Sequence, residues 1–208
     1  NRLEGEIPAA LGRLGKLLGM GLDRNRLSGE IPPELGALSS IEKLWLSGNM
    51  LAGDLPPELT RLDTLVDGDG IDLRWNLLAS QNPAVLAFLR LKQADGGDWE
   101  SSQTVPPNEA AAAALGSDAI ELRWKPISYF WDEGGYQVVA ATSPSGPYHE
   151  AGRTESKEDD RFVVTGLAPE TTYYFVVRSF TLPHGANFNT LVSDPSTMVS
   201  TTTEAGAA

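Results

Sequence analysis

Three closely spaced carboxylates are the residues of this sequence best suited to holding a metal ion. Asp67, Asp69 and Asp72 lie in the stretch 67–72, which reads DGDGID. Carboxylate oxygens on a turning loop are typical ligands of calcium. The stretch lacks the Glu that closes a helix–loop–helix calcium site at its twelfth position, and two flanking helices are not expected. Calcium is therefore a candidate ligand here, and a glycine-rich bulge is the alternative.

Groups that could perform catalysis are scarce. The sequence has no cysteine and two histidines, His149 and His184, both in expected turns. Disulfides, thiol nucleophiles and cysteine-bound zinc are thus excluded. No Gly-x-Ser-x-Gly, His-Glu-x-x-His or phosphate-binding glycine loop occurs, and the acidic run 155–160 (ESKEDD) is interpreted as a solvated loop. We expect no enzymatic activity and no cofactor other than the candidate calcium.

With catalysis not expected, binding of a partner is the remaining type of function. Aromatic side chains at outward positions are the main candidates for contacting that partner. Trp45 lies between Leu44 and Leu46, so an extended strand that buries the leucines would point the indole outward. An aromatic ring of this size is costly to leave in water and often anchors an interface. Chance exposure or cover from a neighbouring segment is the alternative, and Trp75 can equally lie beneath a following helix. The expected partner-binding positions are Asp23, Arg24, Lys43, Trp45, Ser47, Asp72, Arg74 and Trp75.

A second aromatic group precedes an expected strand in the later half of the chain. Tyr129, Phe130 and Trp131 are consecutive in ISYFWDEGG. Aromatics in a loop can stack on a sugar or contact a partner protein. They can also pack against the preceding half of the chain, and both interpretations stay open.

The expected partner-binding positions between Asp23 and Trp75 lie within an internal sequence repeat. Asparagines at positions 1, 25 and 49 are 24 residues apart, and Asn76 follows after 27 because about three residues are inserted around DGDG. A single repeat cannot bury its own apolar residues, so stacked repeats must share one elongated core. Each asparagine is expected to bond backbone groups inside its turn, which makes the row structural.

The repeat resembles the leucine-rich repeat, in the 24-residue form known from plant receptors. Residues 14–37 and 38–61 both follow L-x-x-L-x-x-L-x-L-x-x-N-x-L-x-G-x-I-P-x-x-L-G-x, with Met20 and Ile41 as conservative replacements. The resemblance implies a short α/β-type right-handed solenoid over 1–78 that starts in the middle of a repeat. Its strand side would present the outward positions as one binding surface.

A helix is expected to cover the last repeat. Asn82 can cap it and Pro83 suits its first turn, while Gly96 and Gly97 would end it. We assign 79–103, with Trp99, to a helical C-terminal cap and linker. The cap has no cysteine, which favours a bacterial origin, and the open first repeat suggests that more repeats or a cap precede it. The expected apolar face is Val85, Leu86, Phe88, Leu89 and Leu91.

Beyond a Pro-containing boundary at 101–108 the period changes to two, as in Ile120, Leu122 and Trp124. Short alternating strands separated by Gly, Pro and Asp turns predict an antiparallel β-sandwich. Residues 104–204 resemble a fibronectin type III domain, because 164–178 read VTGLAPETTYYFVVR. The resemblance implies an immunoglobulin-like fold with Tyr173 as the tyrosine corner. The long insertion FTLPHGANFNTLVSD is expected to be ordered by its own Phe188 and asparagines.

Charge and hydropathy narrow the class of partner. The 208-residue chain has a formal net charge of −12, which repels phosphate backbones, so we expect no nucleic acid partner. No apolar run approaches the roughly 18 to 20 residues of a membrane-spanning helix, so no membrane insertion is expected.

These patterns together predict a non-catalytic extracellular recognition or adhesion module, secreted or on a bacterial cell surface, that binds a protein or glycan. The first alternative is a structural subunit or spacer of a surface layer, filament or secreted assembly, in contact with copies of itself. The second is an accessory region of a larger secreted hydrolase.

Overall fold

The computed structural model describes residues 2–96 and 98–206. The chain forms two compact units: Asn1–Thr104 with Pro183–Leu191, and Val105–Leu182 with Val192–Ala208. Each unit is described by itself. Asn1 and Gly97, which the sequence assigned to a repeat position and to a helix end, lie outside the described residues.

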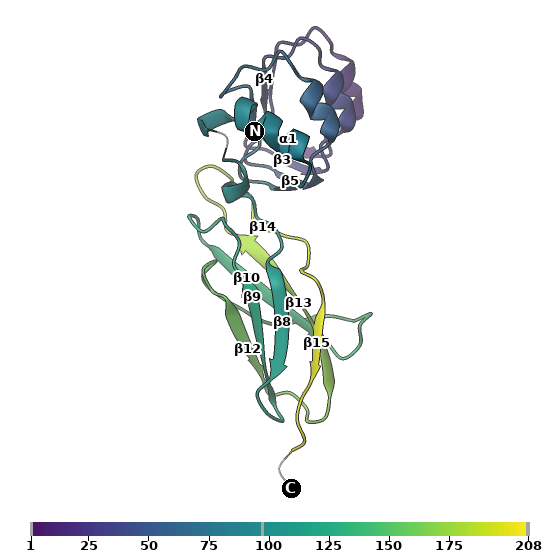
Figure 1. Ribbon diagram of the computed structural model, residues 1–208, viewed down its shortest axis with the longest axis vertical. Coiled ribbons are helices and arrows are strands. Elements are labelled where there is room, and N and C mark those ends of the chain that lie inside the picture. Colours follow the sequence, from purple (N-terminus) through teal and green to yellow (C-terminus); the bar gives the residue numbers. More distant parts are fainter. Residues whose placement is uncertain (1, 97, 207–208) are drawn as a thin grey trace. The chain divides into compact units, whose positions relative to one another are not determined.

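The first unit is built from repeated strands that pair in parallel (Figure 1, purple to teal). One sheet contains β2 (Gly19–Gly21), β4 (Lys43–Trp45) and β6 (Ile71–Asp72). The other contains β1 (Glu4–Gly5), β3 (Arg26–Gly29), β5 (Met50–Asp54) and β7 (Leu77–Ala79). The 3-10 helices η1 (Ala9–Arg13), η2 (Pro33–Ala37) and η3 (Pro57–Arg61) follow successive strands of the second sheet.

The core of this unit consists of the apolar positions of the repeat. Leu44 pairs with Met20 on one side and Ile71 on the other, so equivalent side chains stack in register. Leu44 and Leu46 are fully buried and Trp45 between them is half-buried, as the alternation predicts. Burial of the leucines and isoleucines of successive repeats in one cluster stabilises each repeat through its neighbours.

The spacing of the 3-10 helices depends on glycine. A Cβ on Gly12 would lie 2.1 Å from the Glu34 carbonyl oxygen, and one on Gly36 would lie 2.3 Å from that of Glu58. Only glycine permits this approach of one turn to the next. The third repeat has Thr60 at the equivalent position, and its Oγ1 donates to the Pro57 carbonyl at 2.7 Å. Besides η2, the element that packs against η3 is α1 rather than a further 3-10 turn.

Helix α1 (Pro83–Lys92) begins as expected, because Asn82 Oδ1 accepts from the Ala84 amide at 3.0 Å. Val85 and Leu89 are buried, whereas Leu91, which the sequence placed on the apolar face, is exposed. The helix ends at Lys92, before the expected glycines, and Gln93 bridges to Ile71 of β6. Short 3-10 turns follow as η4 (Ala94–Gly96) and η5 (Glu100–Ser102).

An amide side chain closes each repeat. Asn25, Asn49 and Asn76 accept through Oδ1 from the amides of Leu3, Leu27 and Leu51 at 3.0, 3.1 and 3.0 Å. These bonds run from one repeat to the one before it. We call the row of amide side chains the amide ladder, and it agrees with the structural role that the spacing predicts.

The second unit contains two antiparallel sheets (Figure 1, teal to yellow). The first is β8 (Asn108–Ala114), β9 (Ala119–Lys125) and β12 (Arg161–Thr165), with β9 central. The second sheet has the order β11 (His149–Arg153), β10 (Gly134–Ala141), β13 (Thr172–Thr181) and β14 (Leu191–Val192). Strand β15 (Val199–Thr202) also pairs with β13.

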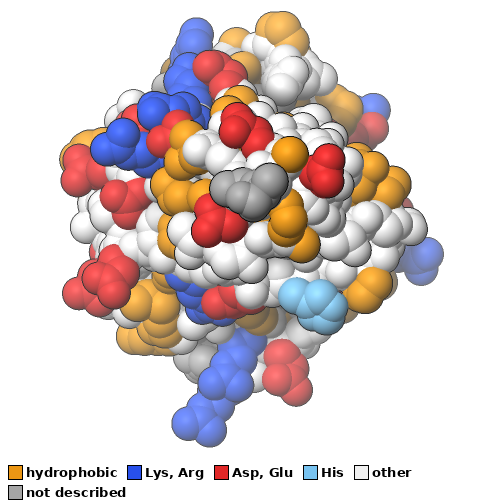
Figure 2. Space-filling model, turned by 90° about the horizontal axis from the view of Figure 1, so that it is seen from below, with side chains coloured by type: hydrophobic (Ala, Val, Ile, Leu, Met, Phe, Trp, Pro, Cys, Tyr) orange, Lys and Arg blue, Asp and Glu red, His pale blue; other side chains and the backbone are white. Residues whose placement is uncertain are grey.

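The sandwich core follows the period-two pattern. Ile120, Leu122 and Trp124 are buried, and the Trp124 ring lies 5.0 Å from that of Tyr136. The Tyr173 hydroxyl accepts from the Ala168 amide at 3.0 Å, which is the contact expected of a tyrosine corner. On the face in Figure 2, acidic side chains are interspersed with hydrophobic ones. Among the described residues, no helix has the length and apolarity needed to cross a membrane.

Candidate functional site: the strand face of the repeats

The first sheet aligns the outward positions of the repeats in rows. Trp45 of β4 pairs with Gly21 of β2 and with Asp72 of β6, so one row reads Gly, Trp, Asp. A Cβ on Gly21 would meet only Asp23 Oδ1, at 3.7 Å, within the range of van der Waals contact. No side chain therefore covers the Trp45 indole at the position of Gly21 on β2. We call the outward side of β2, β4 and β6 the strand face.

Contacts with Lys43 and Asp69 fix the Trp45 indole. Lys43 Nζ lies 4.9 Å from the ring centroid and 2.6 Å from Asp69 Oδ2. The indole Nε1 donates to the Asp69 carbonyl at 3.5 Å. Each contact is weak at an exposed position, of the order of 1 kcal/mol or less. Together they hold the ring in one orientation without covering it.

A charged cluster borders the indole at β6. Arg74 binds Asp72 through two hydrogen bonds, from Nε to Oδ1 and from Nη2 to Oδ2, both 2.9 Å long, and also contacts Asp95. Burial would raise the pKa of Asp72, but the hydrogen bonds and the charge of Arg74 outweigh it and hold that pKa below its ordinary value. Hydrogen bonding to Asp72 raises the pKa of Arg74. The pair is thus charged and rigid.

The remaining expected positions of the strand face differ in exposure. Asp23 is half-buried, Arg24 is exposed and Ser47 is buried. The Trp75 ring lies 4.7 Å from the Arg74 guanidinium and 6.3 Å from the His184 ring. His184 comes from segment 183–191, whose place in this unit nothing in the sequence pattern indicated.

The aromatic run of the second unit separates into a buried and an exposed part. Tyr129 is fully buried and its hydroxyl donates to Asp132 Oδ2 at 2.5 Å. Phe130 and Trp131 are exposed, Trp131 by 66%, and their ring centroids are 4.1 Å apart. Only this pair is available to a partner.

Lys157 corrects the interpretation of 155–160 as a wholly solvated loop. Its side chain is 3% exposed, and Nζ lies 3.6 Å from the Tyr129 ring centroid and donates to Thr181 Oγ1 at 3.0 Å. Burial lowers the pKa of Lys157 to about 8. The predominantly acidic run ESKEDD gave no signal of this, because one long cationic side chain can enter the core of a sandwich while its neighbours stay in water.

The three carboxylates proposed for calcium do not form a site. Asp67 pairs with Lys92 at 2.7 Å, Asp69 with Lys43 at 2.6 Å and Asp72 with Arg74 at 2.9 Å. Within residues 2–96 and 98–206, no three His, Cys, Asp or Glu side chains are grouped to hold a metal ion.

The glycine-rich bulge, the alternative for this stretch, has its own backbone partners. Gly68 and Gly70 donate through their amides to the Leu91 and Lys92 carbonyls at 2.8 and 3.0 Å, at the end of α1. The inserted residues therefore attach the third repeat to the helix.

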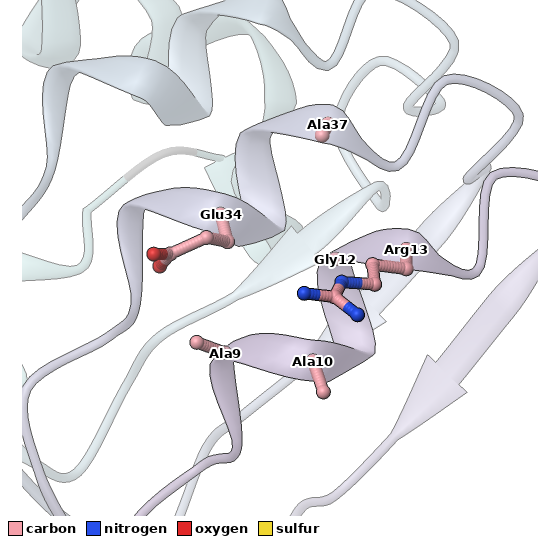
Figure 3. A pocket seen from close by; sticks show the side chains of 6 residues that line it. All are labelled: Ala9, Ala10, Gly12, Arg13, Glu34 and Ala37. Atoms are coloured by element: carbon pink, nitrogen blue, oxygen red, sulfur yellow. The ribbon is translucent and has the colours of Figure 1, made fainter.

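A hollow lies between η1 and η2. Its volume is about 290 Å³, and small side chains line most of it. Figure 3 shows Arg13 from η1 and Glu34 from η2 at its border. Of the residues that the structure describes, none that lines this hollow is His, Ser, Thr, Lys or Tyr, so Glu34 has no catalytic partner of these types there.

One protein family and several solved structures are similar to parts of this chain. Residues 40–62 match the Leucine Rich Repeat family. A Fn3-like protein from Clostridium thermocellum is similar at 19% identity, over 47% of this chain and 90% of that one, with a TM-score of 0.37. The fn3 domain of human contactin 1 has 18% identity over 50% and 80%, with a TM-score of 0.38.

A β-1,2-glucanase from Parabacteroides distasonis is similar at 20% identity, over 51% of this chain and 13% of that one, with a TM-score of 0.40. Residues 40–62 thus carry the pattern of a leucine-rich repeat.

Proposed function

We propose that this chain is a non-catalytic extracellular recognition or adhesion module, secreted or displayed on a bacterial surface, that binds a protein or glycan. In this proposal the repeats form a short solenoid over 1–78, followed by a helical cap and linker at 79–103. Residues 104–204 form a fibronectin type III domain, except that segment 183–191 belongs to the first unit. The strand face is the principal binding surface, and the Phe130–Trp131 pair is a second contact.

The observation that carries the proposal is the environment of Trp45. The indole is held by Lys43 and Asp69, borders the Asp72–Arg74 pair, and has the open surface of Gly21 beside it. A rigid, partly exposed aromatic ring among fixed charges suits a ligand that offers both an apolar face and hydrogen-bonding groups. Sugars and extended peptides both meet that description.

Glycan and peptide arrays with the whole chain test the proposal. Trp45→Ala is expected to lower the signal of bound ligands at least tenfold, because the ring supplies the apolar contact. Leu91→Ala is the control, since it removes an exposed apolar side chain that lies on α1 and not on the strand face. If Trp45→Ala binds normally, Trp131→Ala tests the second contact. Unchanged binding in both variants would refute the proposal.

A structural role in a surface layer, filament or secreted assembly is the second candidate. Leu3, Leu14 and Leu18 are exposed, and such apolar side chains favour contact with another chain. Light scattering over a concentration series tests this role. Growth in mass that Leu18→Ser abolishes would favour assembly, whereas a constant monomer mass would favour a foreign partner.

A further inference from the structure

One left-handed residue precedes the ladder asparagine in each of three repeats. Arg24, Gly48 and Trp75 have φ values of 52°, 67° and 55°. This conformation is unfavourable for Arg and Trp, and its recurrence at one position shows that the repeat imposes it. We call the dipeptides 24–25, 48–49 and 75–76 the turn row. Three backbone carbonyls of this row, those of Asn25, Asn49 and Trp75, accept hydrogen bonds from outside their own repeats.

The donors are two asparagine side chains of segment 183–191. Asn187 Nδ2 donates to the carbonyls of Asn49 and Trp75, both at 2.9 Å. Asn189 Nδ2 donates to the Asn25 carbonyl at 2.7 Å. Both side chains are buried. The segment thus crosses three successive repeats, and each of the three carbonyls accepts one amide hydrogen.

The segment is shaped for this contact. Asn187 Oδ1 accepts from the backbone amide and the side-chain amide of Asn189, at 2.9 and 2.8 Å, so the two side chains orient each other. A Cβ on Gly48 would lie 2.4 Å from the Ala186 carbonyl oxygen, so a side chain at position 48 would displace the segment. Phe188, between the two asparagines, is 67% exposed. Alternate side chains therefore face the turn row, and Phe188 does not order the segment.

The chemistry of the turn row is selective. Its contact atoms are carbonyl oxygens, which accept hydrogen bonds and repel negative charge. Asparagine supplies N–H donors, while aspartate at pH 7 supplies only acceptors and would leave the buried carbonyls unpaired. A site of this kind distinguishes an amide from a carboxylate of almost the same shape.

We infer that the turn row is a peptide-recognition site for an extended segment with amide side chains at alternate positions, Asn-x-Asn, and that the chain occupies it with its own segment 183–191. The site is separate from the proposed contact at Trp45, so either can fail alone. Because the occupant is part of the same chain, its effective concentration keeps an external peptide out of the wild-type protein.

The test uses the full chain with Asn187→Asp and Asn189→Asp combined, and Asn108→Asp as control, because Asn108 is exposed on β8. Amide hydrogen exchange in 183–191 is expected to rise at least tenfold in the double variant and to stay unchanged in the control. A fluorescent peptide HGANFNTL (184–191) should then bind the double variant but not the wild type. The same peptide with both asparagines replaced by Asp should bind neither.

Three results would overturn the inference: unchanged exchange in the double variant, no binding of the Asn peptide up to about 1 mM, or equal binding of the Asp peptide. The limit of about 1 mM is the scale of effective concentration for a short tether. If circular dichroism shows the double variant unfolded, Asn189→Ala replaces it, because the Asn187 contacts remain. Faster exchange confined to 187–191 is then expected, and wild-type exchange contradicts the inference.

Discussion

The Gln103 side chain completes the amide ladder by accepting a hydrogen bond from the Leu78 amide at 3.0 Å. Its Nε2 donates to the Leu73 carbonyl at 3.0 Å, as Asn76 Nδ2 donates to the Leu46 carbonyl at 3.1 Å one repeat earlier. A glutamine that lies in the linker by sequence thus performs the task of an asparagine in the repeats. Its longer side chain reaches the buried groups from a backbone that no longer follows the repeat.

Replacing Gln103 with alanine should destabilise the first unit. The substitution leaves the buried Leu78 amide without its acceptor, which costs about 1–3 kcal/mol. The Leu73 carbonyl loses one donor but keeps Asn76 Nδ2, at 3.1 Å. Urea unfolding followed by circular dichroism measures the loss. Gln81→Ala, at an exposed position, is the control and should stay within about 0.5 kcal/mol of wild type. Equal stability of the two variants would contradict the role assigned to Gln103.

Alanine at Gly36 should cost more than alanine at Thr60, although the two positions are equivalent in the repeat. A Cβ on Gly36 would lie 2.3 Å from the Glu58 carbonyl oxygen, so the 3-10 turns must separate, at about 1–3 kcal/mol. Thr60→Ala removes a local, exposed hydrogen bond and should be nearly neutral. Thermal unfolding of both variants measures the difference, and a neutral Gly36→Ala would show that the turns can separate freely.

The stability of the second unit should increase as pH rises from about 8 to about 10. The folded-state pKa of Lys157 is about 8, below its ordinary value of 10.5, so the unfolded chain binds more protons in this interval. A difference of one bound proton changes the free energy of unfolding by about 1.4 kcal/mol per pH unit, and each state is partly titrated at one end of the interval, so the increase should be about 2 kcal/mol. Above pH 10 it should reverse, because burial raises the pKa values of Tyr129 and Tyr136 and only unfolded tyrosines ionise.

Urea unfolding at several pH values measures this dependence. Lys157→Met should remove the increase between pH 8 and 10 while retaining the apolar part of the side chain. Lys125→Met, at an exposed strand position, is the control. A wild-type profile that is flat in this interval would show that Lys157 remains solvated.

Calcium should not raise the melting temperature of the protein. Asp67, Asp69 and Asp72 each neutralise a different cation, so a calcium ion would have to break three ion pairs to gather them. Differential scanning calorimetry with calcium and with a chelator should give superimposable traces. A shift of several degrees in calcium, lost in Asp69→Asn, would reinstate the site.

Local patterns made part of this structure predictable. The alternation at Leu44 and Leu46 and the spacing of Asn25, Asn49 and Asn76 identify strands and buried amides, because a repeat presents each signal several times. Gln103 follows Asn76 by the same 27 residues that separate Asn76 from Asn49, but the change of residue type concealed it.

Features that occur once had no such signal. Asn187 and Asn189 lie more than a hundred residues from the carbonyls they contact, and a single Asn-x-Asn in a long insertion does not specify a target. Lys157 lies among acidic residues and Tyr129 precedes two exposed aromatics, so neither local pattern indicates that tertiary packing buries these side chains. The candidate strand face was therefore accessible from the sequence, whereas the turn row and its occupant required three-dimensional structure.

The direction of the amide ladder has a consequence for how the chain is made. Asn25 serves Leu3, Asn49 serves Leu27, Asn76 serves Leu51 and Gln103 serves Leu78, always from the later repeat to the earlier one. The ribosome synthesises the earlier repeat first, so the backbone amide of each of these leucines is made before the Asn or Gln side chain that accepts its hydrogen bond. At each stage of synthesis, the most recent repeat therefore has one backbone amide without its side-chain acceptor. Synthesis of Gln103 provides the last of these acceptors, for Leu78.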